Sequence, residues 1–304
     1  MLQRLRKDFG NSDNSCLFVT RVMSVHELKA VAVTTPYWKP GDDWTREILK
    51  GIAGEIEDGD FVVISEKAIS TASGNIVDEA TVRPSLGAKM IASFWMRVVW
   101  GYFLCILCHF RKKLTLQIRA YPLEMGSRHK QVAIQYTTLV QVLMFGSEGG
   151  IDGSNLPYSY VSLPLRNAHY LAEKIRSRIE AETGKTVFVM ISDTDKTYSL
   201  TNFHFTPRPY PMKDIHSFGG IVAYVIGQML RLRKRATPIA VVGGNCSVEA
   251  ALEVAEVANR ARGSGAGRTV WDMAKRFKVD LDGVSWKMLD GIKHKPIVIV
   301  RVRE

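Results

Sequence analysis

The spacing of hydrophobic positions predicts a chain in which short strands alternate with amphipathic helices. Apolar runs of four to six residues, bounded by glycine or polar residues, are typical of buried strands. They predict strands at 30–33, 61–65, 160–164, 187–192, 239–242 and 296–300. Apolar residues that recur every three or four positions predict helices that begin near Trp44, Leu171 and Val248, and an apolar run predicts another helix over 218–232. The proline-containing stretch 198–212 is expected to be a loop.

A long apolar segment interrupts this alternation between residues 86 and 110. It is apolar almost all round, with Arg97 near its middle and the basic run 111–113 behind it. A helix of about 20 residues could cross a bilayer core, but Arg97 would cost roughly 2.5 kcal/mol or more there. We therefore favour a helix buried between domains or subunits. Association with a membrane surface around Trp95 is the alternative.

Two acidic turns after predicted strands carry the first candidate chemistry. The loop 149–157 places Asp152 among three glycines, next to Ser154 and Asn155, and the strand 187–192 is followed by Asp193-Thr194-Asp195. Hard divalent cations take oxygen ligands of these types. Such turns are also common as plain connections between a strand and a loop, so composition leaves both readings open.

The net positive charge of the chain favours anionic partners. The 304 residues include 41 Lys and Arg against 30 Asp and Glu, for a formal charge of +11, which favours polyanions such as nucleotides, nucleic acid or an anionic membrane. The basic patches 4–7, 111–113 and 231–235 are not interleaved with aromatic residues, as a single-strand stacking platform would be. Four cysteines are too few for a secreted disulfide framework, and the basic start has no apolar signal core directly behind it. We expect a cytoplasmic protein with reduced thiols, for which nucleic acid is not the partner.

Two further motifs could bind a cofactor or a phosphate, but we favour purely structural roles for both. Cys105, Cys108 and His109 match the spacing of a haem attachment site, but they fall inside the apolar segment, where buried, inert cysteines are the default. The glycine-rich run 263–269 could face a phosphate, yet it lacks the lysine and spacing of a P-loop. A helix stop with a flexible link is the favoured interpretation.

Several motifs in order resemble the coenzyme F420-0:gamma-glutamyl ligase family. They cover roughly residues 30–85 and 145–250. The motifs are Gly41-Asp42-Asp43 before a helix, Asp58-Gly59-Asp60 before a strand, Glu66-Lys67-Ala68-Ile69-Ser70 after it, Gly150-Ile151-Asp152-Gly153-Ser154-Asn155 with Ser162-Leu163-Pro164, and Ser192-Asp193-Thr194.

The resemblance implies an α+β fold of mixed sheets with packed helices, in two intertwined subdomains. It implies a GTP-dependent ligase, with Mg²⁺ or Mn²⁺, that adds L-glutamate to a deazaflavin precursor through an acyl phosphate and works as a homodimer. Carried over by motif, Asp152 and Asp193 would bind metal, with Thr194 at a second metal. The nucleotide contacts would be Glu66, Lys67, Ser70 and Asn155. No residue is assigned as catalytic.

The chain departs from the family pattern at three points. Thr71 stands where the family usually has lysine, and 195–199 replaces a Gly-Arg-Pro-Trp-like run. The family's later acid or amide metal ligand has no match. A non-catalytic nucleotide-binding relative and a membrane-associated relative therefore stay open as alternatives. The expected organisation is a lead with the first strand at 1–29, a ligase-like domain at 30–262 with a hydrophobic insertion at about 86–120, and an extension at 263–304.

Overall fold

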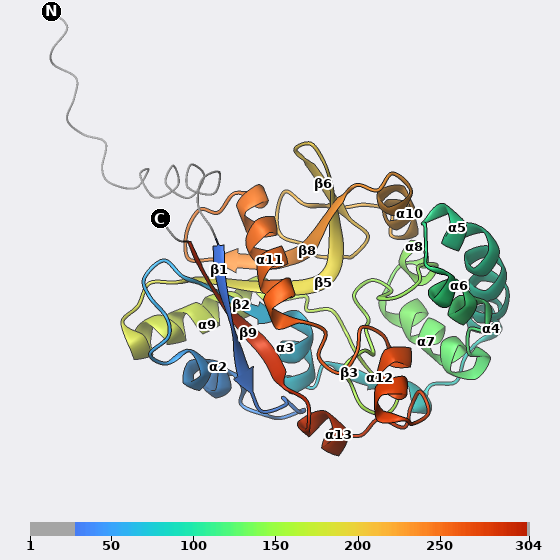
Figure 1. Ribbon diagram of the computed structural model, residues 1–304, viewed down its shortest axis with the longest axis horizontal. Helices are drawn as coiled ribbons and strands as arrows, with labels where there is room; N and C mark the ends of the chain where they lie inside the picture. Colours follow the sequence, from blue (N-terminus) through green and yellow to red (C-terminus); the bar gives the residue numbers. More distant parts are fainter. Residues whose placement is uncertain (1–27, 303–304) are drawn as a thin grey trace, which may run out of the picture.

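The computed structural model describes residues 28–302, and the predicted basic lead lies outside them (Figure 1). One sheet of seven strands organises the molecule. Its order is β1 (Leu28–Thr35), β9 (His294–Val302), β2 (Phe61–Ser65), β5 (Phe188–Leu200), β6 (Phe203–Thr206) and β7 (His216–Ser217), while β8 (Arg233–Val242) pairs with β5. The pairs β2–β5 and β6–β7 are parallel and the others antiparallel. A second sheet pairs β3 (Ile76–Asp78) with β4 (Tyr160–Ser162). The expected α+β fold with a mixed sheet is confirmed.

Helices cover both faces of the large sheet because its strands are apolar on both sides. Successive side chains on a strand point to opposite faces. Val62 and Ile64 pack with α2 (Trp44–Ile52), α3 (Glu66–Ala72) and α9 (Ala168–Thr183). Phe61 and Val63 pack on the other face with α11 (Val248–Arg262). This strand therefore has apolar helices on both sides, and its end is held in a fixed position.

The region after Ser192 differs from the sequence-based expectation. The predicted turn at Asp193 is wrong, and so is the first part of the predicted loop over 198–212, because β5 runs on to Leu200 and β6 pairs back onto it. The second part of that prediction is confirmed, since residues 207–212 belong to no helix or strand. The pairing of β5 with β8 shifts register between Asp193 and Lys196, so the strand is irregular where the acids lie. Tyr198 and Phe205 bury their rings in this hairpin, and the three prolines follow it.

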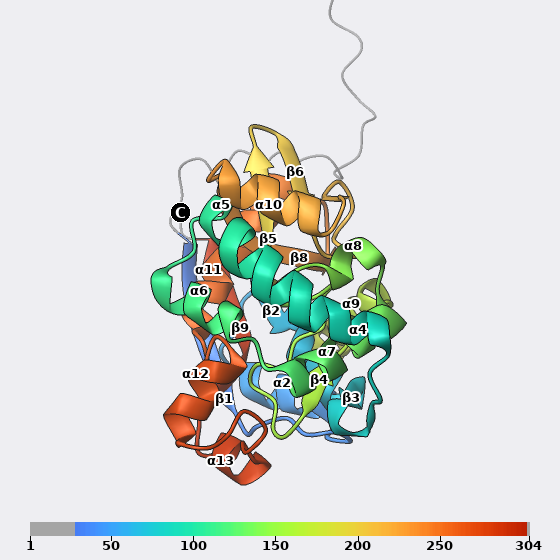
Figure 2. The same cartoon turned by 90° about the vertical axis from the view of Figure 1, so that its right-hand side faces the viewer.

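The apolar segment forms part of a helical lobe beside the sheet (Figures 1 and 2). The lobe contains α4 (Leu86–Met90), η2 (Ile91–Leu104), α5 (Cys105–Leu107), α6 (Lys112–Arg119), α7 (Leu123–Tyr136), α8 (Leu139–Val142) and α10 (Ile221–Met229). η2 is a π-helix, a wider winding than the α-helix. Its buried residues are Ala92, Met96, Trp100 and Gly101, and the buried Cys105 follows as the first residue of α5.

One face of η2 packs inward and the other is exposed. The indole nitrogens of Trp95 and Trp100 each donate to the Leu143 carbonyl at 2.8 Å, and Arg97 Nε donates to the Tyr121 carbonyl at 2.8 Å. Arg97 is thus satisfied inside the protein. Cys105 and Cys108 are buried in the lobe, and burial raises the pKa of both thiols.

The outer face of this helix carries exposed apolar side chains, among them Leu86, Phe94 and Phe103. By length and composition, Leu86–Leu107 is the one helix within residues 28–302 that could cross a membrane, a test that core helices of soluble proteins also pass. Contact with a membrane surface stays a prediction.

A buried chain of charges fixes α7 to the segment that enters the glycine loop. Lys130, fully buried, donates to the carbonyls of Val142 and Met144 and to the Glu148 carboxylate. His129 bridges Glu148 at 2.8 Å and Glu79 at 2.6 Å. Burial lowers the pKa of His129, but Glu79 and then Glu148 raise it well above its usual value. The imidazole is therefore a cation held between two carboxylates.

Replacing His129 by glutamine should destabilise the protein in a pH-dependent way. Because the folded pKa is raised, the contribution of His129 to stability is fully present below about pH 6.5 and is lost as pH rises through the folded value. We expect a loss of about 3 kcal/mol in the free energy of unfolding at about pH 6, and a smaller loss at about pH 9. Urea denaturation of His129→Gln against the native chain measures it, with the exposed His169→Gln as control. A loss that grows with pH would contradict this account.

Candidate functional site

A cleft of about 710 Å³ opens where the parallel strands β2 and β5 reach the same edge of the sheet. Open sheets bind ligands at the carboxyl ends of such strands. The cleft is lined by the start of α3, the loop that carries Asp152, β5 at Asp193, residues 259–268, and the segment 293–296 that enters β9. The two acidic segments singled out in the sequence therefore lie in one cleft.

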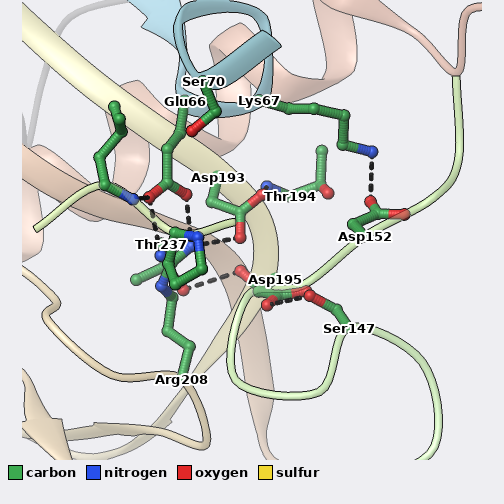
Figure 3. Close-up of polar contacts among 12 residues, drawn as sticks. Glu66, Lys67, Ser70, Ser147, Asp152, Asp193, Thr194, Asp195, Arg208 and Thr237 are labelled. Carbon is green, nitrogen blue, oxygen red and sulfur yellow. Dashed lines mark hydrogen bonds and ion pairs between the residues drawn. The ribbon is translucent and has the colours of Figure 1, made fainter. Parts of the chain in front are cut away.

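Lys67 holds the glycine loop against α3 (Figure 3). Its ammonium donates to the Asp152 carboxylate, to Ser154 Oγ at 2.7 Å and to the Ser154 carbonyl at 2.9 Å. Asp152 also accepts from the Ser154 amide at 2.6 Å and from its hydroxyl at 3.0 Å. Asp152 and Lys67 are thus locked as a pair at the mouth of the loop.

The buried side chain of Arg208 joins two further acids of the site, Glu66 and Asp193 (Figure 3). Arg208, fully buried, donates from Nη1 and Nη2 to the two oxygens of Glu66 at 2.7 and 2.9 Å, and from Nη1 to Asp193. Glu66 also accepts from the Leu165 amide at 2.8 Å. Burial lowers the pKa of Arg208, but Glu66 and Asp193 outweigh it and raise the pKa. The guanidinium fixes the first residue of α3 to β5.

Another acid of β5, Asp195, lies near Asp193 and Asp152. Asp195 accepts from Ser147 Oγ at 2.6 Å, and burial, then Asp193, raises its pKa well above the usual value. Asp152 contributes to this rise. Thr194, between the two acids of β5, is exposed with its side chain at the cleft. Carboxyl groups therefore crowd together where the glycine loop meets β5, which favours the protonated form of Asp195.

The oxygen donors at this place fit a hard divalent cation by their chemistry. Mg²⁺ and Mn²⁺ prefer carboxylate and hydroxyl oxygens, which Asp152, Asp193 and Thr194 supply. Within residues 28–302, however, no group of three or more His, Cys, Asp or Glu side chains is arranged to hold a metal ion. Lys67 and Arg208 instead neutralise Asp152 and Asp193. The metal assignment of Asp152, Asp193 and Thr194 stays a prediction.

The four residues assigned to the nucleotide fall into two groups. Lys67 and Asn155 line the cleft. Glu66 and Ser70 are buried beneath it, Glu66 on Arg208 and Ser70 with its hydroxyl on the Leu163 carbonyl at 2.7 Å. Their contact with a nucleotide stays a prediction. Thr71 also lines the cleft, and its hydroxyl donates a hydrogen bond to the Lys67 carbonyl at 2.8 Å.

The glycine-rich run 263–269 is a wall of the cleft. α11 ends at Arg262, so the expected helix stop is confirmed. Asn155 contacts the run from across the cleft, and the flexibility expected of the link stays a prediction. Asn155 Oδ1 accepts from the Ala266 amide at 2.6 Å, and its Nδ2 donates to the Gly267 carbonyl at 3.0 Å. Asn155 lies 111 residues before Ala266 and 112 residues before Gly267 in the sequence. Local sequence patterns therefore do not reveal these contacts.

Sequence reasoning also missed Arg208. The sequence has an Arg-Pro-aromatic run at Arg208-Pro209-Tyr210. It is separated from Asp193 by the β5–β6 hairpin, and the hairpin returns it to that acid. The family resemblance predicts an Arg-Pro run directly after Asp193-Thr194. The signal that could have identified Arg208 is this Arg-Pro-aromatic run, which stands farther along the chain, after the β5–β6 hairpin.

A second cavity of about 350 Å³ adjoins the cleft. Six Phe, Tyr or Trp side chains line it, namely Tyr121, Phe145, Tyr158, Tyr160, Tyr224 and Trp271. The two cavities share Asp152, Ser154, Thr194 and Arg268 in their walls. We call these four residues the junction. A basic cleft and an aromatic cavity therefore meet at candidate metal ligands.

The family model for F420-0:gamma-glutamyl ligase matches residues 32–220, which is more than half of the chain. The chain belongs to this family. An uncharacterized protein of Methanocaldococcus jannaschii is 29% identical over 91% of this chain and 97% of its own length. Arg262 and Arg268 lie beyond the region that matches the family model.

Ligases of this family match over a shorter stretch. The coenzyme F420:L-glutamate ligase of Methanocaldococcus jannaschii is 29% identical over 46% of this chain and 49% of its own length. That of Archaeoglobus fulgidus is 31% identical over 53% of this chain and 57% of its own length. The chain thus spans about half the length of these two ligases.

Removing Arg208 should destabilise the fold more than removing an exposed arginine. Arg208→Met leaves Glu66 and Asp193 as buried carboxylates without their cation, so we expect a loss of about 3–5 kcal/mol in the free energy of unfolding. Adding Glu66→Gln should recover part of it, because one unpaired charge is removed. Chemical denaturation measures both, with Arg128→Met, in an exposed pair with Glu124, expected to cost less than about 1 kcal/mol. Equal costs for Arg208→Met and Arg128→Met would refute the role of Arg208.

Proposed function

We propose that this protein is a GTP- and divalent-metal-dependent ligase that forms a γ-glutamyl amide on a coenzyme F420-like acceptor through an acyl phosphate. The observation that carries the proposal is the meeting of a basic cleft and an aromatic cavity at the junction. Membership of the F420-0:gamma-glutamyl ligase family supports the reaction class. The uncharacterized relative, which matches nearly the whole chain, leaves the acceptor to be tested.

The basic cleft suits the phosphate chain of a nucleotide. Eight Lys and Arg side chains line it against three carboxylates, those of Asp152, Asp193 and Glu256. Charge-assisted hydrogen bonds from such cations are the usual means of binding phosphate. GTP is the nucleotide that the family resemblance implies.

The second cavity suits a planar heteroaromatic acceptor. Aromatic rings stack on flat ligands and bury large areas, while a few polar groups set the orientation. Tyr121, Phe145, Tyr224 and Trp271 supply rings, and the junction supplies the polar groups. An acceptor seated here would direct its carboxylate at the nucleotide.

The proposed reaction has two displacements. An oxygen of the acceptor carboxylate attacks the γ-phosphorus, and the bond from that phosphorus to the β-bridging oxygen breaks, releasing GDP. The amine nitrogen of L-glutamate then attacks the carbonyl carbon, the carbon–oxygen bond to phosphate breaks, and the amine proton passes to water. Positioning and electrostatic stabilisation do most of the work in phosphoryl transfer.

The protein's own residues supply that positioning. Asp152, Asp193 and Thr194 would hold Mg²⁺ or Mn²⁺, which when bound neutralises phosphate oxygens. Lys67 fixes Asp152 and Ser154 at the junction, and Arg208 fixes Asp193 on β5. These ion pairs set where the two carboxylates point before any ligand binds. Homodimer assembly and a cytoplasmic location belong to the same proposal.

Substituting the acids should abolish glutamylation. Asp152→Asn and Asp193→Asn each keep the side-chain shape and remove the charge that binds metal, so we expect turnover to fall on the order of 100-fold or more. The assay is GTP-dependent glutamylation of coenzyme F420-0 with Mn²⁺. Asp43→Asn is the matched control, because it lies in the N-cap of α2, outside the cleft lining, and asparagine caps equally well.

Unchanged turnover in both variants would refute the metal assignment. The ion pairs on Asp152 and Asp193 also favour a second candidate, a non-catalytic nucleotide-binding relative. Calorimetric binding of GTP by the native chain, without GDP release for any acceptor tried, would support that candidate and overturn the ligase.

A further inference from the structure

The cleft contains more cations than its acids neutralise. Asp152 pairs with Lys67, Asp193 with Arg208, and Glu256 with both Lys196 and Arg260. Within the described part of the chain, no carboxylate lies within ion-pair distance of Arg262 or Arg268. Arg262 is the last residue of α11, and Arg268 lies in the glycine-rich wall that follows it; both line the cleft.

Arg262 carries buried donors without acceptors. It ends α11 and lines the cleft, and its Nη2 makes a long contact of 3.5 Å with Ser192 Oγ. Its Nε and Nη1 are enclosed and meet no hydrogen-bond acceptor in residues 28–302. Burial lowers the pKa of Arg262 to about 10, against the opposing effect of Asp193, so the side chain remains a cation at neutral pH. Unsatisfied buried donors of this kind are rare, and a bound water, ion or ligand usually supplies the acceptor.

Arg268 stands at the junction. It is exposed, and among residues 28–302 it is the one Lys or Arg that lines both cavities, beside Asp152, Ser154 and Thr194. Its segment is held in place by Asn155 and by Arg276, whose Nη1 donates to the Gly265 carbonyl at 2.8 Å. A side chain at Gly267 would meet the Met273 amide at 2.8 Å, so the wall is closely packed. Arg268 is therefore anchored at its base, with its guanidinium free to meet a ligand.

We propose that Arg262 and Arg268 form a two-arginine clamp for oxyanions, with Arg262 on the phosphate chain of the nucleotide and Arg268 on the reacting carboxylate of the acceptor. The clamp rests on the proposed function and deepens it. A carboxylate that approaches a triphosphate is repelled by it, and a guanidinium between the two anions offsets that repulsion. The planar fork of arginine matches both groups.

The two halves of the clamp are tested by separate binding measurements. Calorimetry with inorganic triphosphate and Mg²⁺ tests Arg262, and calorimetry with coenzyme F420-0 tests Arg268. We expect Arg262→Gln to weaken triphosphate binding about tenfold to 100-fold and to leave acceptor binding unchanged. Arg268→Gln should do the reverse, and in turnover it should raise the KM for the acceptor more than the KM for GTP.

Lysine variants separate binding from folding. Arg262→Lys and Arg268→Lys keep the charge and lose the fork, so each should recover part of the lost affinity. Arg178→Gln removes one exposed arginine on α9 and serves as the control for net charge. Native affinity for triphosphate in Arg262→Gln, or native affinity for the acceptor in Arg268→Gln, would overturn that half of the clamp. If the native protein bound neither inorganic triphosphate nor coenzyme F420-0, both halves of the clamp would be overturned.

These measurements also distinguish the clamp from the ligase function. Triphosphate binding needs no turnover, so Arg262-dependent binding in a protein that never glutamylates would keep the phosphate half and refute the ligase. Normal glutamylation by Arg262→Gln and Arg268→Gln, at unchanged KM values, would refute the clamp and keep the ligase.

Discussion

The buried ion triad of Arg208, Glu66 and Asp193 is the constraint around which the cleft is built. An arginine without solvent contact must have its charge and donors satisfied by the protein, since burying an unpaired guanidinium costs several kcal/mol. The triad draws together the start of α3, the middle of β5 and the segment after β6 (Figure 3). These segments cannot separate without exposing or orphaning three charges. The end of β2 and the acids of β5 therefore keep a fixed relation.

A looser arrangement faces this rigid side of the cleft. The glycine loop is attached through Lys67 and Asp152, and the wall 263–269 is attached to the loop through Asn155. The Lys67–Asp152 pair is partly exposed and therefore weaker than the triad, and Asn155 bonds the wall through the backbone of Ala266 and Gly267. One side of the cleft is preorganised and the other can adjust. This division suits a reaction in which two anions must be brought together and a product released.

The sequence predicted well what depends on local pattern. Continuous apolar runs located β2 and β9, helical spacing located α2, α9 and α11, and the ordered motifs indicated the family. The acids Asp152 and Asp193 were placed in one site by resemblance, and the structure brings both to one cleft. What failed depends on distant contacts. Arg208 follows an inserted hairpin, so its relation to Asp193 is set by strand pairing and not by spacing. Asn155 looked free for a ligand because its partners lie more than 100 residues away. The strand through Asp193 looked like a turn because polar residues there face a cleft instead of solvent.

The central claim is that the junction is where metal, nucleotide and acceptor meet. The most direct measurement is a crystal structure with Mn²⁺ and a non-hydrolysable GTP analogue, with anomalous scattering used to locate manganese. The account predicts an anomalous peak bound by Asp152, Asp193 or Thr194 and by phosphate oxygens, with the phosphates in the basic cleft against Arg262. Manganese bound elsewhere, or a nucleotide seated in the aromatic cavity, would contradict it.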